Sequence, residues 1–174
     1  DKGSHNLRAL VKLLKRMLEV QGDFWIRLLY LYPDEITDEL IALMASDRRI
    51  CPYLDIPLQH CNDDILKSMK RATSKERIVS TLTKLRQAIP DMSIRTSLIV
   101  GFPGETEEQF NELVQFIQDH PLDNIGVFTY SREPGTPAAE LPDQVSDAIK
   151  KRRRDKLMKV QHKIVCKRNA AMIG

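Results

Sequence analysis

Short apolar segments alternate with helical segments along this chain, and this alternation constrains the fold more than any other feature of the sequence. Four segments are typical of buried strands, namely 24–32, 53–59, 93–100 and 124–131. Helical patterns precede, separate and follow them at 7–18, 34–46, 63–71, 74–88, 106–120 and 144–171. Connections of this length let consecutive strands run parallel. We therefore expect an α/β fold with about four parallel strands and covering helices.

Four parallel strands are too few to close an eight-stranded barrel, but they suit part of a barrel or an open sheet. In both architectures, ligands bind beyond the C-terminal ends of the strands. The turn Gly101–Glu105 lies at such an end, and Thr106 with Gln109 matches a capping box for the next helix. Glycine allows a sharp turn and close approach of a ligand, yet such turns often only connect two elements. The sequence leaves these two roles open.

The charge of the chain is modest, with a net value of +3, and does not by itself indicate nucleic-acid binding. The basic run Lys150–Arg154 is the exception, because a helix face of this kind can bind phosphates or an acidic partner. A solvated helix face is the other interpretation. No apolar run reaches the roughly 20 residues of a membrane span, so we expect no membrane association.

The three cysteines, Cys51, Cys61 and Cys166, are too widely spaced for a local metal motif. Their odd number also argues against a disulfide framework and fits a reducing cytoplasm. We therefore predict no metal ligand in this chain. His60 follows a strand but stands alone, so we assign it no role in proton transfer.

Polar side chains fall on single faces of the expected strands, because side chains alternate along a strand. Arg95 and Ser97 share a face with Ile99, and Asp55 shares one with Gln59. These faces would look into a barrel lumen or a ligand cleft. A second interpretation is an internal ion pair of Asp55 with Arg95 or with Arg27 of the first strand, since buried charge is costly unless it is paired. The two interpretations are compatible.

Three long motifs carry a family resemblance: YLDIPLQHCNDDILKSMKR at 53–71, IRTSLIVGFPGETEEQF at 94–110 and FTYSREPGTPAA at 128–139. Together they resemble the methylthiotransferases of the radical S-adenosylmethionine superfamily, over the chain from about Phe24 to its end. Within that family, the sequences at 30–33 and 55–62 resemble the branch that modifies an aspartate of a small-subunit ribosomal protein. The branch that modifies an adenosine in transfer RNA typically has other residues at both places.

The resemblance implies a partial (β/α)6 TIM-like barrel, of which residues 1–143 would supply the third to sixth strands. Residues 144–174 would form a basic helix leading toward a further domain. The implied enzyme is cytoplasmic and adds a methylthio group to the β-carbon of the aspartate. It uses S-adenosylmethionine and [4Fe-4S] clusters for radical chemistry.

The resemblance also implies a set of cofactor-binding residues, with no catalytic residue assigned. Gln59 matches a position that contacts the ribose, and the fifth strand, which cradles the adenine and methionyl groups, supplies Arg95, Ser97, Ile99 and Gly101. Arg95 is the expected partner of the methionyl carboxylate, because a guanidinium pairs bidentately with a carboxylate. Glu105 is expected to cap the turn or the following helix instead of touching a ligand.

One departure from the family is large. The radical motif is Cys-x3-Cys-x2-Cys, and no such spacing occurs here. We therefore expect the 174-residue chain by itself to bind no cluster and to be inactive. Two alternatives stay open. One is a fragment of a transfer RNA adenosine methylthiotransferase, and the other is a cluster-free, non-catalytic binding module. Whichever interpretation holds, a weak nucleic-acid contact through the basic C-terminal helix is a further expected partner contact.

Overall fold

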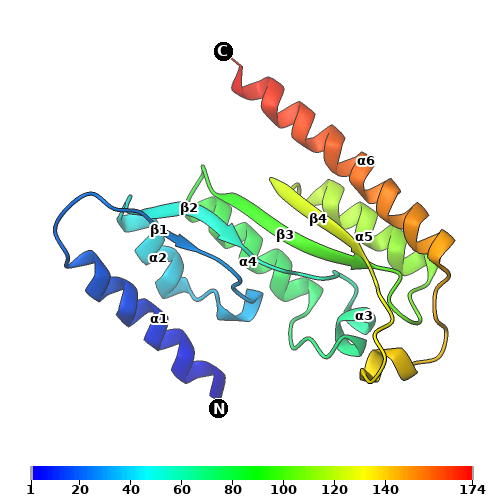
Figure 1. Ribbon diagram of the computed structural model, residues 1–174. Helices are drawn as coiled ribbons and strands as arrows, with labels where there is room; N and C mark the ends of the chain where they lie inside the picture. The colour runs from blue at the N-terminus through cyan, green and yellow to red at the C-terminus, as the bar shows by residue number, and fades with distance from the viewer. Residues whose placement is uncertain (1, 174) are drawn as a thin grey trace.

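The computed structural model describes residues 2–173, with side chains described for 9–170 and 173. Its strands form one parallel sheet in the order β1-β2-β3-β4 (Figure 1). The strands are β1 (Ile26–Leu28), β2 (Ile50–Asp55), β3 (Ser93–Val100) and β4 (Asn124–Thr129). The predicted α/β fold with about four parallel strands and covering helices is therefore confirmed.

The helices are α1 (Lys2–Leu18), α2 (Asp38–Ser46), α3 (Asp63–Ser68), α4 (Lys75–Ala88), α5 (Glu107–Asp119) and α6 (Asp147–Met172). Helix α1 lies beside α2 at the β1 end of the sheet, and α6 lies beside β4 at the other end (Figure 1). Two short 3-10 turns, Pro33–Glu35 and Pro137–Glu140, precede α2 and α6. No helix in the described part of the chain is long and apolar enough to cross a membrane.

The helix starts follow from capping side chains. Thr37 accepts a hydrogen bond from the amide of Leu40 at 3.1 Å, so the segment predicted as one helix over 34–46 is a 3-10 turn followed by α2. Thr106 and Gln109 form the expected capping box of α5. In α1, Val11 and Leu14 are buried, as the amphipathic pattern predicts, whereas the side chain of Leu7 lies outside the described residues.

Two predicted strands have different ends in the structure. The segment 24–32 pairs with β2 only from Ile26 to Leu28, because Tyr30 has a left-handed φ of 59° that breaks the ladder. The segment 53–59 starts earlier, at Ile50, and ends at Asp55. Pro57 has no amide hydrogen to donate to the ladder, which favours the early end.

The sheet has one covered face and one open face. On β3, Ile94, Thr96, Leu98 and Val100 are buried under the helices. On the open face Arg95 is exposed, and Ser97 and Ile99 are half-buried, which confirms the predicted alternation for this strand. On β2, Leu54 and Asp55 are both buried, and Asp55 forms an ion pair with Arg95 of the open face.

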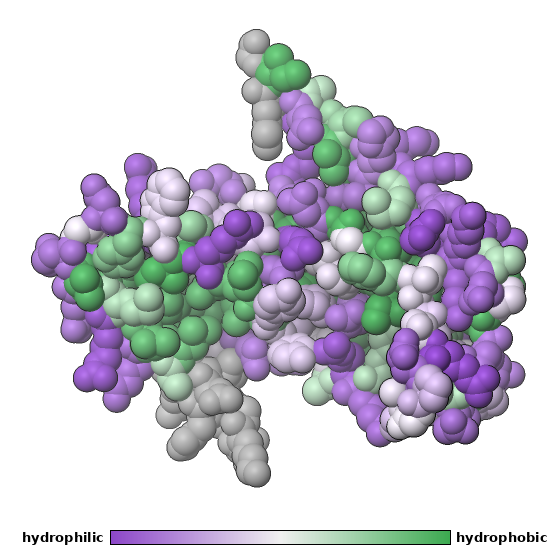
Figure 2. Space-filling model, viewed as in Figure 1, coloured by the Kyte–Doolittle hydropathy of each residue, from purple (hydrophilic) through white to green (hydrophobic). Residues whose placement is uncertain are grey.

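The surface around β1 is notably apolar. Trp25 is 87% exposed and Leu29 is 50% exposed, and Figure 2 shows hydrophobic surface over the part of the molecule where β1 and β2 lie in Figure 1. Monomeric soluble proteins rarely expose large contiguous apolar surfaces. The open face is therefore the side of the sheet on which a partner or ligand would lie.

Candidate functional site

A cavity of about 320 Å³ lies at the C-terminal edge of the sheet. Gln59 and Ile99 line it together with two aromatic side chains, Phe102 and Tyr130, whose rings meet edge to face at 5.3 Å. The remaining wall comes from residues 68–71 and 136–138. Ligand sites are typically apolar clefts with a few polar groups that fix orientation. A cavity with this lining suits the flat, partly polar ring of an organic ligand.

Gln59 is held at this edge by its backbone. Its amide donates to the carbonyl of Ser97 at 2.9 Å, and its carbonyl accepts from the amide of Ile99 at 2.8 Å. These bonds form although Gln59 has a left-handed φ of 69°. A non-glycine residue in this region is strained, and such strain often marks a functional position. The structure therefore brings Gln59 and Ile99 together, although Gln59 lies beyond the end of β2.

The turn after β3 is organised by a buried carboxylate. Glu105 is 4% exposed and accepts hydrogen bonds from the amides of Gly101 and Phe102, the second at 3.1 Å. Of the two caps expected for Glu105, the turn and the following helix, the structure shows the turn. Burial raises the pKa of the Glu105 carboxyl, while Arg153 and the two amides act in the opposite direction. The amide of Gly101 is thus occupied by Glu105.

Helix α6 supports the turn from outside. Arg153 donates to the carbonyl of Glu105 at 3.0 Å and lies 3.5 Å from its carboxylate. A Cβ atom at Gly101 would overlap the Lys150 side chain, and Gly101 has a left-handed φ of 73°. Only glycine meets both conditions at low cost. Gly101 is therefore in close contact with α6, while its neighbour Phe102 lines the cavity.

An ion pair lies on the open face of the sheet, between Asp55 at the end of β2 and Arg95 near the start of β3. Arg95 lies 3.4 Å from Asp55, whose side chain is 1% exposed. Arg27 instead lies over the ring of Tyr53, 3.7 Å from its centroid. Of the two pairings considered for Asp55, the one with Arg95 forms in the described structure. The Arg95 side chain is 44% exposed, so it keeps donors free for a ligand.

The structure therefore brings only two of the predicted cofactor-binding residues into the lining of this cavity. Gln59 and Ile99 line the cavity, whereas Arg95 and Ser97 lie on the same face of β3 outside its lining. Sequence reasoning missed Phe102 and Tyr130. Both stand inside the quoted motifs, at the ends of β3 and β4, where parallel strands place ligand contacts.

A second hollow of about 380 Å³ adjoins the first and shares Lys70 and Arg71 with it. Its walls include Tyr32 and Pro57, and the guanidinium of Arg71 lies 5.2 Å from the Tyr32 ring centroid. Lys70 has a left-handed φ of 56°. The basic turn between the two hollows therefore offers positive charge at the edge of the candidate site.

Two buried groups near the site are structural. His60 accepts from the amide of Asn62 at 2.9 Å, and burial lowers its pKa to about 4. Burial raises the pKa of the Cys61 thiol to about 12, so it stays protonated at neutral pH. Within the described residues, no group of three or more His, Cys, Asp or Glu side chains could hold a metal ion.

Similarity to known proteins extends over the whole chain. The model of the radical SAM superfamily matches residues 3–117. The ribosomal protein uS12 methylthiotransferase RimO of Protochlamydia amoebophila is 64% identical over all 174 residues, which span 37% of that protein. The proteins of the same name from Chlamydia felis and Pelobacter propionicus are each 53% identical over 95% of this chain. The chain thus spans little more than a third of the curated relatives it matches.

Two solved structures share the fold. Archaeal Elp3 from Methanocaldococcus infernus superposes with a TM-score of 0.55 at 20% identity, covering 67% of this chain and 27% of that one. The radical S-adenosylmethionine methyltransferase TsrM from Kitasatospora setae superposes with a TM-score of 0.53 at 20% identity. The match covers 65% of this chain and 22% of the TsrM chain. The parallel sheet with its helices therefore matches part of a radical SAM TIM-like barrel.

Proposed function

This chain belongs to the radical S-adenosylmethionine superfamily, and we propose that it forms part of a cytoplasmic methylthiotransferase that modifies the ribosomal protein uS12. One observation carries the proposal, namely the 64% identity to a uS12 methylthiotransferase over the whole of the chain. The group added would be a methylthio group on the β-carbon of an aspartate. The chain spans 37% of that relative, so the activity is proposed from the relative as a whole.

The residues at the C-terminal edge fit one wall of an S-adenosylmethionine site. The rings of Phe102 and Tyr130 with the side chain of Ile99 would contact the adenine, and the Gln59 amide group would bond the ribose. The cofactor, when bound, supplies the radical that activates a C–H bond of the substrate. What this chain contributes is the shape and polarity of the pocket and the exclusion of water from it.

Arg95 would bind the methionyl carboxylate. Its guanidinium carries five donors, and in the structure it makes one ion pair, with Asp55 at 3.4 Å. Asp55 would then orient the guanidinium while Arg95 reaches the ligand from the open face. Ser97, on the same face between Arg95 and Ile99, would face the middle of the bound cofactor.

The cysteines do not fit a [4Fe-4S] cluster. Cys61 is buried, Cys51 is half-buried and Cys166 is exposed on α6, and none stands with the others in a ligand group among the described residues. We assign none of them to a cluster. The 174-residue chain alone is accordingly proposed to be inactive, and iron analysis after anaerobic reconstitution would test this. A stoichiometric cluster would contradict it.

Mass spectrometry of uS12 tests the proposed function. We expect the methylthio-aspartate to disappear from uS12 when the gene that carries this sequence is deleted, and to return when the gene is restored. Nucleoside analysis of transfer RNA from the same cells is the matched control. Loss of a methylthio-adenosine with unchanged uS12 would instead support the transfer RNA enzyme. If both were unchanged, a non-catalytic module would be the better description.

A further inference from the structure

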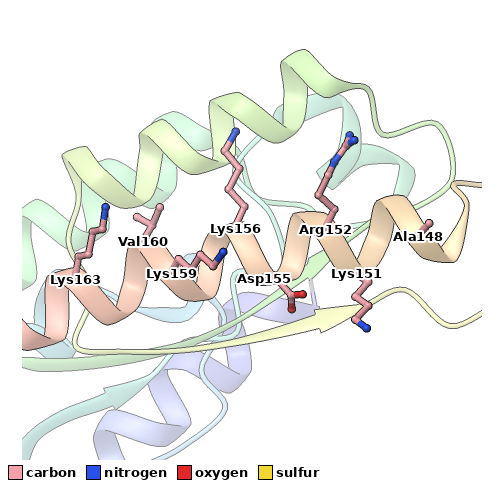
Figure 3. A pocket seen from close by; sticks show the side chains of 8 residues that line it. All are labelled: Ala148, Lys151, Arg152, Asp155, Lys156, Lys159, Val160 and Lys163. Carbon is pink, nitrogen blue, oxygen red and sulfur yellow. The ribbon is translucent and has the colours of Figure 1, made fainter.

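Helix α6 carries a basic stripe that the proposed active site does not use. Eight residues line a shallow groove of about 690 Å³ along this helix (Figure 3): Ala148, Lys151, Arg152, Asp155, Lys156, Lys159, Val160 and Lys163. We call these residues the basic stripe. They recur three and four positions apart, so they lie on one helix face. Over this length the stripe extends roughly 22 Å along the helix axis.

The charges of the basic stripe are only partly neutralised. Its single carboxylate, Asp155, pairs with Arg154 at 2.9 Å. Arg152 reaches Glu107 at 3.4 Å, and Lys156 bonds Asn111 at 2.9 Å. In Figure 3 both side chains extend toward α5, whereas that of Lys151 extends to the other side.

Three lysines of the basic stripe form no ion pair with any described residue, and all three are exposed: Lys151, Lys159 and Lys163. Lys151 extends to one side of the groove and Lys163 to the other, with Lys159 between them along α6, so all three positive charges act on anything that approaches the groove. A row of uncompensated ammonium groups attracts a polyanion.

We propose that the basic stripe binds the phosphate backbone of RNA. Lysine is depleted in protein–protein interfaces, whereas phosphate contacts are made largely by lysine and arginine. The basic stripe contains no aromatic residue on which a base could stack. The contact is therefore expected to be independent of sequence. The choice of RNA over DNA rests on the proposed function, because a ribosomal protein is found on RNA.

The same helix cannot use this face to enter a membrane. The opposite side of α6 is already packed, with Arg153, Leu157 and Gln161 buried against the rest of the chain. Gln161 donates to the carbonyl of Leu122 at 3.1 Å, which fixes that side of the helix. An interfacial membrane helix needs a free apolar face. The basic stripe offers only Ala148 and Val160 as apolar residues.

Fluorescence anisotropy with a labelled single-stranded RNA tests the proposal. We compare the 174-residue chain with the triple variant Lys151→Ala/Lys159→Ala/Lys163→Ala over a series of salt concentrations. If three phosphates are neutralised, the slope of log K against log salt is about −2 for the parent chain and close to zero for the variant. The variant is expected to bind at least about tenfold more weakly at low salt.

The matched control is Lys12→Ala/Lys67→Ala/Lys84→Ala, which removes the same charge from α1, α3 and α4. It should bind RNA nearly as the parent does. A triple Lys→Arg variant of the basic stripe should also keep binding, and far-UV circular dichroism checks that each variant is folded.

Three results would overturn the proposal: no RNA binding by the parent at low salt, equal losses in both alanine variants, or tighter binding to polyglutamate or to phosphatidylserine vesicles than to RNA. Failure of this test leaves the uS12 measurement untouched, so the two proposals are separable.

Discussion

Arg153 of α6 and Glu105 of the turn after β3 form a buried ion pair, with 3.5 Å between guanidinium and carboxylate. The two side chains are 5% and 0% exposed. The Glu105 carboxylate accepts hydrogen bonds from the amides of Gly101 and Phe102, and Phe102 lines the cavity. The wall of the candidate site is therefore fixed by α6, although none of the side chains described for this helix lines the cavity.

Arg153→Met should destabilise the chain by roughly 3–5 kcal/mol, because it leaves the Glu105 carboxylate buried without its partner. The double variant Glu105→Gln/Arg153→Met should cost less, since no charge is then left unpaired. Urea unfolding at neutral pH measures both free energies. Lys84→Met is the control, because it breaks an exposed surface pair with Asp38 and should cost little stability. Equal costs for Arg153→Met and Lys84→Met would contradict the assigned role.

Gly101→Ala and Gly104→Ala separate backbone strain from steric overlap. Both glycines have left-handed φ angles, of 73° and 80°, but a Cβ would meet the Lys150 side chain only at Gly101. Gly104→Ala should cost about 1 kcal/mol from the backbone alone. Gly101→Ala should cost roughly 1–3 kcal/mol more. Adding Lys150→Ala to Gly101→Ala should recover the difference, as measured by urea unfolding, and no recovery would rule out the overlap.

The lowered pKa of buried His60 leads us to expect that the folded chain loses stability in mild acid. Its pKa in the folded chain is about 4, below the ordinary value of 6.5, because it is buried. As the pH falls from 6.5 toward 4, the unfolded chain takes up this proton first, so the free energy of unfolding decreases. The expected loss from pH 7 to pH 5 is about 2 kcal/mol for this group. His60→Gln should flatten that part of the pH profile, and an unchanged slope would assign the acid sensitivity to other groups.

Arg95→Ala in the full-length protein should raise the KM for S-adenosylmethionine at least about tenfold, as expected when a charged partner of a carboxylate is removed. This variant also leaves the buried Asp55 carboxylate without its ion-pair partner, so a loss of stability must be distinguished from a loss of cofactor binding. Asp55→Asn/Arg95→Ala should restore stability without restoring the KM. If the double variant recovered the KM, Arg95 would be a structural partner of Asp55 and no ligand of the cofactor.

Much of the fold follows from local pattern. Apolar alternation in 93–100 fixed which side chains of β3 face the helices, and Thr106 with Gln109 fixed the start of α5. The family resemblance likewise rests on contiguous motifs. The strand ends at Leu28 and Asp55 were predicted less well, because a left-handed residue or a proline decides them only together with the neighbouring strand.

Sequence alone determined the order of strands and helices, the polar face of β3 and the family, since each depends on residues that are near neighbours in the chain. Tertiary structure decided that Asp55 pairs with Arg95 and not Arg27, and that Arg153 reaches Glu105 across 48 positions. It also decided that Phe102 and Tyr130 complete the cavity. Such pairings depend on strand register and on where each helix packs, and both are set by burial of the whole core and not by any local pattern.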